Sequence, residues 1–504
     1  MDRRRFIGWM GAATAASLAS CGGGGGSSAG PAPSPAPPPA TGLDWTGLSN
    51  GLDGKLILPG NPLYAQAAAV ANKRYEAVQP QAVARCASPD DVKEVLAFVR
   101  SNQLAVTPRC GGHSFGGYST GTGVVLDVTP MNAIQVNGNG TCTIGAGARL
   151  ADVYDQLTAQ GVSIPTGTCP TVGISGITMG GGISFMDRKY GLTCDNLVSA
   201  RMVTADGRLL DVSETQEPDL FWALRGGGGG NFGVVTSFTF KTHAAQDLTE
   251  FSAGYAFSDL HKVLDTWQTW QQGLPDEIWS FLVFSFYASN QPPSATLYGV
   301  SLLDEAALLP YWNAFKTATG VTPAFTSTGR KSYRDVMLAG CGSRTVSQCH
   351  MVGLTPDGNM TPYYFASTSD YFNQPLPSQG IDTLLTSMDN ARTAGITGQV
   401  LLDVMGGALG RVAKDATAFW HRDALFSAEY YMDAPPNAPA TWHHDLRTAM
   451  KPWSSGGAYV NYIDPLITDW QAAYYGSNYA KLVQVKAAYD PNELFKFAQG
   501  IPSK

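Results

Sequence analysis

Two short loops combine glycine with side chains that can act as nucleophiles. The first reads Arg109-Cys110-Gly111-Gly112-His113-Ser114, and the second, fifty-odd residues later, reads Gly167-Thr168-Cys169-Pro170-Thr171-Val172-Gly173. An imidazole nitrogen and a thiolate can both form covalent bonds to an electron-poor partner. A single histidine is usually a core or surface residue, and a single cysteine is usually a small buried apolar group. Each residue alone therefore favours a structural role, whereas the two loops together favour a ligand site.

Glycine also clusters at Gly180-Gly181-Gly182 and at 226–230. Glycine reaches positive φ and lets a ligand lie directly against main-chain N–H groups, so such loops often hold phosphates, although they also form plain turns. The chain has no GxGxxG that opens a helix after a strand, which disfavours the dinucleotide fold of nicotinamide enzymes. It also has no CxxC pair and no HExxH, so the sequence gives no support for a metal site.

The segments between these loops alternate between short strands and short helices. Helical spacing with Ser88 as the N-cap predicts a helix over 90–101, and further helices are expected at 151–159 and 217–224. Strands rich in β-branched residues are predicted at 124–128, 142–147 and 233–240. Mixed short helices and strands indicate an α+β domain.

The whole chain has 504 residues, which is long enough for at least two folding units. Its formal net charge is −7, and no cluster of Lys and Arg could form a phosphate-binding stripe, so we expect no nucleic-acid partner.

The N-terminus predicts export. Residues 1–21 combine Arg3-Arg4-Arg5, a short apolar run and Leu18-Ala19-Ser20-Cys21, which resemble a twin-arginine signal ending in a bacterial lipobox. The alternative is an ordinary signal peptide with Cys21 near its cleavage site by chance. Residues 22–41 are rich in Gly, Ser and Pro and predict a linker without a core. We therefore expect a periplasmic or cell-surface lipoprotein of a bacterium, in contact with a membrane only through its lipid anchor.

The two nucleophile loops resemble those of the berberine bridge enzyme-like branch of the vanillyl-alcohol oxidase flavoproteins. The resemblance continues to the end of the chain, through Tyr459-Val460-Asn461-Tyr462 and Asp490-Pro491-Asn492-Glu493-Leu494-Phe495. It implies an α+β fold with a two-subdomain PCMH-type FAD-binding domain and an antiparallel-sheet substrate domain backed by helices. The implied parts are 42–77 (N-terminal part of the FAD domain), 78–242 (PCMH-type domain), 243–455 (substrate domain) and 456–504 (a C-terminal segment returning to the FAD domain).

In that family FAD is held by two covalent bonds, which implies a flavin bonded to His113 and Cys169 in this chain. Arg109 then has two open interpretations, as a partner of the flavin ring or FAD pyrophosphate and as a member of a surface salt bridge. The further FAD contacts implied by the resemblance come from Gly111, Gly112, Ser114, Val172, Gly173, Gly176, Gly181, Gly182, Val235 and Asn461.

The same resemblance implies the acid–base residues. Tyr462 occupies the position of a catalytic base that takes the proton of a substrate hydroxyl, and Asp403 could accept the proton of that tyrosine. The alternatives are a core tyrosine and a carboxylate that caps a turn. Val404-Met405 departs from the Pro-Tyr of plant relatives, which leaves the substrate open. Asp403 is similar to the residue in oligosaccharide oxidases of the family, so a carbohydrate or another alcohol is the expected small-molecule substrate.

Three functions remain possible at this stage: an oxidase that returns electrons to O2, a dehydrogenase that uses another acceptor, and a lipid-anchored binding protein without turnover. Val172, three residues after Cys169, occupies the position that in relatives admits O2 when it is Val and blocks it when it is Leu. This favours the oxidase, and a monomer is expected. The six cysteines other than Cys21 and Cys169 allow fifteen disulfide pairings, of which only the short loop Cys341–Cys349 is predicted.

Overall fold

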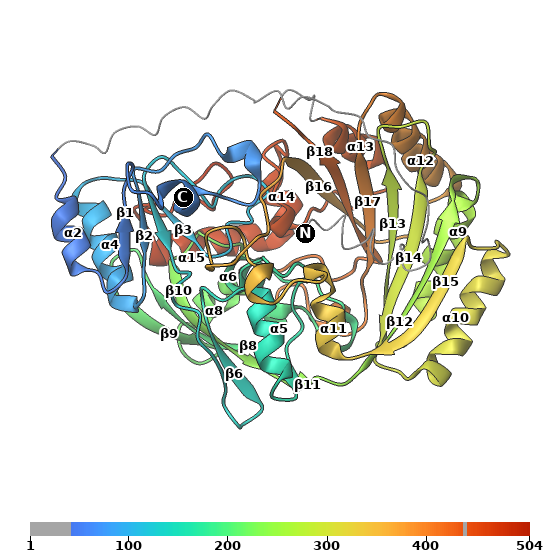
Figure 1. The fold of residues 1–504 in the computed structure, drawn as a ribbon, viewed down its shortest axis with the longest axis horizontal. Coiled ribbons are helices and arrows are strands. Elements are labelled where there is room, and N and C mark those ends of the chain that lie inside the picture. The colour runs from blue at the N-terminus through green and yellow to red at the C-terminus, as the bar shows by residue number, and fades with distance from the viewer. Residues whose placement is uncertain (1–41, 437–440) are drawn as a thin grey trace.

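The computed structural model describes residues 42–436 and 441–504. The predicted signal peptide (1–21), the linker (22–41) and Cys21 lie outside the described residues. The described chain forms two halves side by side, with the early and late segments in one half and most residues from about 245 to 455 in the other (Figure 1). The segment after α11 is the exception, because His350 Nε2 lies 3.0 Å from Asp152 Oδ1 of the first half.

The first sheet of the left half has the order β1 (Lys55–Ile57), β2 (Ala82–Arg85), β4 (Val124–Asp127), β3 (Val106–Arg109). Strands β2, β4 and β3 are parallel, so β3 ends at the same edge as β2. Helix α4 (Pro89–Ser101) starts as predicted, because the Ser88 side chain accepts a hydrogen bond from Asp91 N and Pro89 needs no N–H partner at the first position. It packs against α2 (Trp45–Gly51), where the rings of Trp45 and Phe98 lie 5.0 Å apart.

The second sheet has the order β5 (Ile134–Val136), β6 (Thr141–Gly145), β10 (Val234–Lys241), β8 (Leu197–Val203), β9 (Leu209–Ser213), and every neighbouring pair is antiparallel. Helices α5 (Leu150–Thr158) and α8 (Pro218–Leu224) stand where the sequence predicts them. The predicted strands at 124–128, 142–147 and 233–240 correspond to β4, β6 and β10, with ends that differ by one or two residues.

The right half is built on one seven-stranded antiparallel sheet. Its order is β15 (Phe325–Lys331), β12 (Leu248–Ala256), β14 (Ser294–Ser301), β13 (Ile278–Phe286), β17 (Gly398–Val404), β18 (Phe426–Asp433), β16 (Phe365–Phe372). Helices α9 (Leu260–Trp270), α10 (Glu305–Thr319), α12 (Ser378–Thr393) and α13 (Trp442–Met450) cover its outer face, and the inner face is turned toward the left half (Figure 1). The predicted fold class, with an antiparallel-sheet domain backed by helices, is confirmed.

The C-terminal segment crosses back to the left half through α14 (Trp470–Tyr475) and α15 (Tyr479–Tyr489). Buried Lys486 fixes it there, because its Nζ donates hydrogen bonds to Asn231 O, Asp490 Oδ2 and Phe495 O. Tyr475 also donates to Gly227 O at 3.1 Å. The chain end therefore supports the glycine cluster at 226–230.

The shorter elements complete the fold. They are α3 (Tyr64–Ala68), α6 (Ile174–Met179), α7 (Asp187–Tyr190), α11 (Tyr333–Met337), β7 (Val162–Ser163), β11 (His243–Ala244), and the 3-10 turns η1 (Lys73–Tyr75), η2 (Thr193–Asn196), η3 (Phe257–Asp259), η4 (Gln271–Gly273), η5 (Ala339–Cys341), η6 (Ser347–Cys349), η7 (Leu409–Arg411), η8 (Val460–Tyr462) and η9 (Gly476–Asn478).

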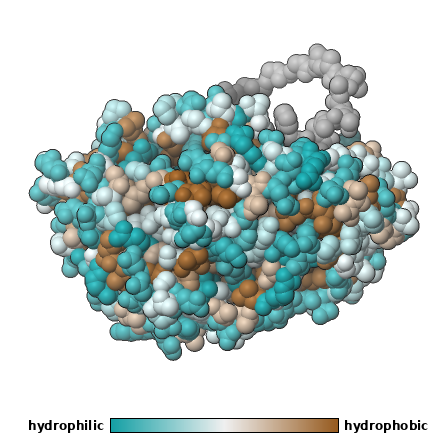
Figure 2. All heavy atoms as spheres, turned by 90° about the horizontal axis from the view of Figure 1, so that it is seen from below, coloured by the Kyte–Doolittle hydropathy of each residue, from teal (hydrophilic) through white to brown (hydrophobic). Residues whose placement is uncertain are grey.

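The predicted disulfide Cys341–Cys349 is present and closes a loop with a sequence separation of 8. Within residues 42–436 and 441–504, no helix combines the length and apolarity that crossing a bilayer requires. The same residues contain no group of three or more His, Cys, Asp or Glu side chains arranged to hold a metal ion. The face seen in Figure 2 is mostly hydrophilic, with scattered hydrophobic side chains.

Candidate active site

The loops that carry His113 and Cys169 meet at their glycines. A Cβ atom on Gly111 would lie 2.4 Å from Gly173 N, and one on Gly173 would lie 2.1 Å from Cys110 Sγ and 2.5 Å from Gly111 N. Neither position can hold a side chain without moving backbone, so glycine is required at both. This close contact brings His113 and Cys169 to the wall of one large cavity between the two halves.

His113 is neutral in this environment. Burial first, and then the positive charge of Arg149, lower the pKa of His113 to about 3. Its Nε2 is buried and has no hydrogen-bond partner among the residues that the structure describes. A neutral ring nitrogen that is enclosed but unpartnered at a cavity wall is suited to bond to a cofactor.

Arg109 is held mainly by a buried ion pair. Its Nη2 donates to Asp127 Oδ2 at 2.8 Å and to Ala67 O at 2.5 Å. The predicted salt bridge is therefore present, but it is buried rather than at the surface, and the role of Arg109 towards the cofactor stays a prediction. Nη1 is buried without a partner among the described residues, and Arg109 does reach the cavity wall.

The remaining predicted cofactor contacts separate into two groups. Those that line the cavity are Gly111, Gly112, Ser114, Val172, Gly173, Gly176, Val235 and Asn461, together with the backbone of Gly228, Gly229 and Gly230. Gly181 and Gly182 do not line it. They lie behind the wall, where Gly182 N donates to the Tyr459 hydroxyl at 2.8 Å and a Cβ on Gly181 would meet the Phe419 ring at 2.8 Å. Their positive φ shapes the turn rather than a ligand contact.

Tyr459 and Tyr462 both line the cavity. The Tyr459 hydroxyl accepts from Gly182 N, Ile183 N and Asn461 Nδ2 at 2.8, 3.2 and 2.8 Å. Burial raises the pKa of Tyr459 to about 12, although these donors act in the opposite direction. Tyr459 is therefore a structural tyrosine whose hydroxyl is already occupied.

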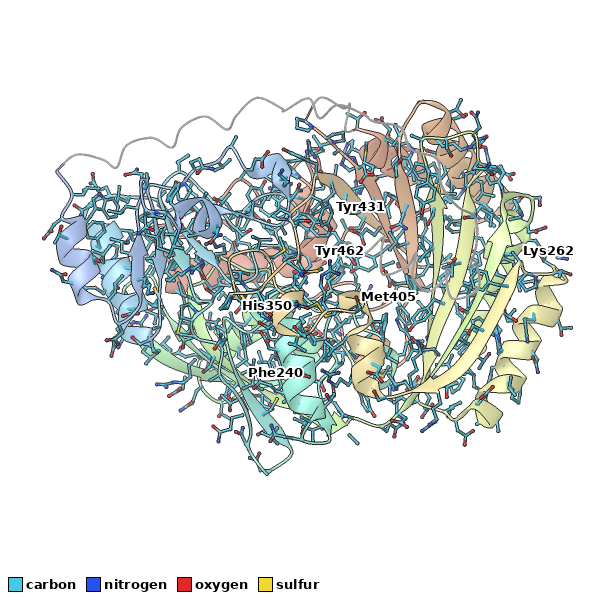
Figure 3. All side chains as sticks on the ribbon, viewed as in Figure 1. Phe240, Lys262, His350, Met405, Tyr431 and Tyr462 are labelled. Atoms are coloured by element: carbon cyan, nitrogen blue, oxygen red, sulfur yellow. A yellow bond between two sulfur atoms is a disulfide. The ribbon has the colours of Figure 1, made fainter. Side chains whose placement is uncertain are left out.

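The ring of Tyr462 is fixed by two aromatic neighbours. It stacks on Phe115 with centroids 5.3 Å apart, and it meets Tyr459 edge-on at 4.9 Å. Phe115 follows His113 by two residues, so this stacking joins the C-terminal turn η8 to the His113 loop. Figure 3 shows Tyr462 between the two halves, with Tyr431 of the large sheet nearby.

The inner face of the large sheet supplies carboxylates to the opposite wall. Asp403 on β17 is directly opposite Phe281 on β13 and Ser427 on β18. Two residues beyond Ser427, and therefore on the same face, lies Glu429, followed by Tyr431. Asp403, Glu429 and Tyr431 all line the cavity.

Glu429 is a site residue that the sequence analysis missed. Its side chain is buried, and its Oε1 accepts a hydrogen bond from Ser367 Oγ at 3.1 Å. The available signal was a carboxylate within a run that also contains Phe426, Ala428, Tyr430 and Tyr431, because a buried charge usually has a function or a partner.

Comparison with known proteins agrees with this geometry. A family model described as "FAD binding domain" matches residues 80–213, and one described as "Berberine and berberine like" matches residues 458–502. The chain is 32% identical to the uncharacterized FAD-linked oxidoreductase YgaK of Bacillus subtilis, over 90% of this chain and 97% of the relative. It is 29% identical to a chitooligosaccharide oxidase of Gibberella zeae, over 84% of this chain and 87% of that one.

Among solved structures, the berberine bridge enzyme-like protein 1 of Physcomitrella patens aligns with a TM-score of 0.82 and 28% identity, over 91% of this chain and 98% of that one. The matching segments contain both loops of the cavity and the turn that carries Tyr462. The chain thus belongs to the berberine bridge enzyme-like family of FAD-linked oxidoreductases.

Proposed function

We propose that the chain holds FAD through covalent bonds to His113 and Cys169. The residues present fit this cofactor. The buried Nε2 of His113 has no partner among the described residues, the imidazole is neutral, and Cys169 lines the same cavity on the adjoining loop. The glycines at 228–230 present only backbone to the cavity, with positive φ at Gly228 and Gly230, which suits an approaching diphosphate.

We propose that the substrate binds between the flavin loops and the inner face of the large sheet and is oxidised at a C–OH group. The bound flavin supplies the two-electron acceptor for the hydride. The Tyr462 hydroxyl takes the proton of the substrate hydroxyl, while Asp403 receives the proton of Tyr462. Phe115 and Tyr459 keep the Tyr462 ring in one orientation. Glu429, held by Ser367, accepts a hydrogen bond from a second substrate hydroxyl.

The observation that carries this proposal is the placement of Tyr462, Asp403 and Glu429 on the walls of the cavity that His113 and Cys169 also line. A carbohydrate is the favoured substrate class, because carboxylates and aromatic rings together bind the hydroxyls and faces of sugars. Trp279 and Tyr431 provide such rings on the sheet. The relative from Gibberella zeae, named as a chitooligosaccharide oxidase, supports the same class.

We further propose that O2 is the electron acceptor and that H2O2 is released. Val172 lines the cavity, and its backbone is fixed by hydrogen bonds from Val172 N to Cys169 O and from Leu150 N to Val172 O. A side chain held there is one methylene smaller than Leu, which leaves space beside the flavin position. We also propose that the chain is exported through the twin-arginine route, carries a lipid anchor at Cys21, and is a monomer in the periplasm or on the cell surface.

The first experiment asks whether the flavin is covalently bound. After denaturation in acid, the wild-type pellet should stay yellow. The single variants His113→Ala and Cys169→Ala should also stay yellow, because one covalent bond remains in each. The double variant should release its flavin into the supernatant. Cys110→Ala is the matched control, because Cys110 lines the same cavity and should leave both bonds intact. Flavin that washes out of the wild-type pellet would contradict the covalent proposal.

The second experiment tests the reaction. Anaerobic mixing with xylobiose, N-acetylglucosamine oligosaccharides and simple alcohols should bleach the flavin absorbance for at least one sugar. Admission of air should restore the absorbance with stoichiometric H2O2. Reoxidation only by an artificial acceptor would instead identify a dehydrogenase, and no bleaching by any sugar would exclude the carbohydrate class.

A further inference from the structure

A carboxyl group that the proposed function does not use lies directly behind the cavity wall. Asp187 begins α7 and is fully buried. Its Oδ2 accepts a hydrogen bond from Ser184 N at 3.1 Å, and Ser184 lines the cavity. Its Oδ1 is buried and has no hydrogen-bond partner among the residues of 42–436 and 441–504. A buried carboxyl with one unsatisfied oxygen is costly unless it is neutral or has a function.

Helix α7 is attached to the end of β17, the strand that carries Asp403. Arg188 Nη1 donates to Met405 O at 2.7 Å, and Ala408 N donates to Arg188 O at 2.6 Å. Gly407 is required at this contact, because a Cβ there would lie 2.4 Å from Arg188 O. The other terminal nitrogen of Arg188, Nη2, donates to Leu274 O. Both terminal nitrogens of the guanidinium therefore bind backbone carbonyls rather than the Asp187 carboxyl. Met405, at the end of this attachment, is labelled near the centre of Figure 3.

Asp403 also belongs to a polar row that crosses the sheet. Ser427 pairs with Asp403 on one side and with Tyr371 on the other, so the three side chains point to the same face. Directly opposite residues on neighbouring strands have Cβ atoms about 5 Å apart. The Ser427 and Tyr371 hydroxyls are buried and have no partner among the described residues. This row therefore places two buried hydroxyls on the same sheet face as Asp403.

The surroundings of Asp187 favour its protonated form. Burial raises the pKa of Asp187 well above its usual range, the negative charge of Asp403 raises it further, and the Ser184 N–H and Arg188 act in the opposite direction. For Tyr371, burial first, and then Tyr459 and Asp403, raise the pKa, while Arg422 lowers it. A buried carboxyl beside a second carboxylate favours its protonated form, because burial and like charge both disfavour the ion. Asp187 is the enclosed member of the pair, and Asp403 is the member that reaches the cavity.

We propose that Asp187 is a positioning residue, which keeps its carboxyl proton and directs it as a hydrogen bond toward Asp403, so that Asp403 is held as the carboxylate that receives the proton of Tyr462. The inference rests on the proposed function of Asp403. The proton balance is simple: the substrate hydroxyl gives its proton to Tyr462, Tyr462 gives its own to Asp403, and Asp187 gains and loses none.

The test uses two replacements that keep the number and branching of the side-chain heavy atoms, in the flavin-loaded full chain. Asp187→Asn keeps an N–H donor for Asp403, whereas Asp187→Leu removes the donor. Without this donor the pKa of Asp403 should rise. The rate of flavin reduction by xylobiose or an N-acetylglucosamine oligosaccharide falls at low pH as Asp403 becomes protonated, and in Asp187→Leu this fall should begin about one pH unit or more higher. Within this pH range the reduction rate of Asp187→Leu should be about tenfold lower than that of the wild type, and it should recover at higher pH. The pH dependence of Asp187→Asn should follow that of the wild type. Equal loss at all pH values in both variants would show a merely structural role and overturn the proposal.

A second measurement needs no substrate. Infrared spectra at about pH 8.5, where other carboxyl groups such as Asp370 are mostly ionised, should show a protonated carboxyl band that Asp187→Asn removes. In Asp187→Leu a new protonated band should appear as the pH falls toward 6, and adding Asp403→Asn should remove it. Asp211→Asn, at an exposed carboxylate paired with Arg201, is the control that should change neither band. An unchanged spectrum in Asp187→Asn overturns the proposal, whereas the expected bands without reduction by any sugar would contradict the proposed function alone.

Discussion

Asp370 should make the folded protein less stable as the pH rises through the neutral range. This carboxyl lies on β16, on the face covered by α13, and only 1% of the residue is exposed. Burial raises its pKa to about 7, and the partial ion pair with Arg447, whose Nε lies 3.6 Å away, offsets only part of that effect. In the unfolded chain the same group ionises near its ordinary pKa of about 3.9.

The magnitude follows from this difference. Between about pH 4 and pH 7 the folded state binds a proton at Asp370 that the unfolded state has lost, so the free energy of unfolding falls as the pH rises. A pKa difference of about 3 corresponds to about 4 kcal/mol, which is a large part of the stability of a typical domain. The contribution is fully present below the unfolded pKa and is lost as the pH passes through the folded pKa.

Replacement by Asn removes this titration. The free energy of unfolding by urea is to be measured for the flavin-loaded wild type and Asp370→Asn at pH 4 and at pH 8. The difference, variant minus wild type, should be about 4 kcal/mol larger at pH 8 than at pH 4. Asp211→Asn, at a surface carboxylate paired with Arg201, is the control and should run parallel to the wild type. Parallel curves for Asp370→Asn would refute the reasoning, because they would show that Asp370 ionises alike in the folded and unfolded chains.

The other predictions concern the reaction and the N-terminus. Tyr462→Phe should keep the flavin spectrum but slow anaerobic reduction by about 10²–10⁴-fold, and Asp403→Asn should cost less and move the pH optimum upward; a near-normal rate for Tyr462→Phe would place the base elsewhere. Val172→Leu should slow reoxidation in air, followed by stopped-flow absorbance, with little change in reduction; equal reoxidation rates would show that Val172 does not control access of O2. Cys21→Ser should move the protein from the membrane pellet to the soluble fraction, and an unchanged distribution would leave Cys21 without a lipid.

The cofactor side of the site could be predicted because its information is local. Each loop is a contiguous run, and the glycines that the structure requires at Gly111 and Gly173 are visible in the sequence beside His113 and Cys169. Gly181 and Gly182, which do not line the cavity, show the limit of local reasoning. A run of glycines shows that backbone needs positive φ or close contact, but it does not show whether the contact is a ligand or, as here, the Tyr459 hydroxyl and the Phe419 ring.

The substrate side depends on strand register, which the sequence does not state. Asp403, Ser427 and Tyr371 form one row only because β17, β18 and β16 are neighbours in that order. Glu429 was missed for the same reason. A carboxylate inside an apolar strand can face the outer helices, as Asp370 does on β16, or the cavity, as Glu429 does on β18, and a shift of one residue would exchange these faces.

Tyr459 and Tyr462 show how the structure decides between residues that a motif treats alike. They are three residues apart and both reach the cavity, so either could be the base on spacing alone. The Tyr459 hydroxyl accepts from two backbone N–H groups and one side-chain amide, and these bonds anchor the turn at Gly182 to the C-terminal segment. The ring of Tyr462 lies between Phe115 and Tyr459. A base must be oriented, and the stacking on Phe115 that orients the Tyr462 ring also joins it to the His113 loop, which favours Tyr462 as the proposed base.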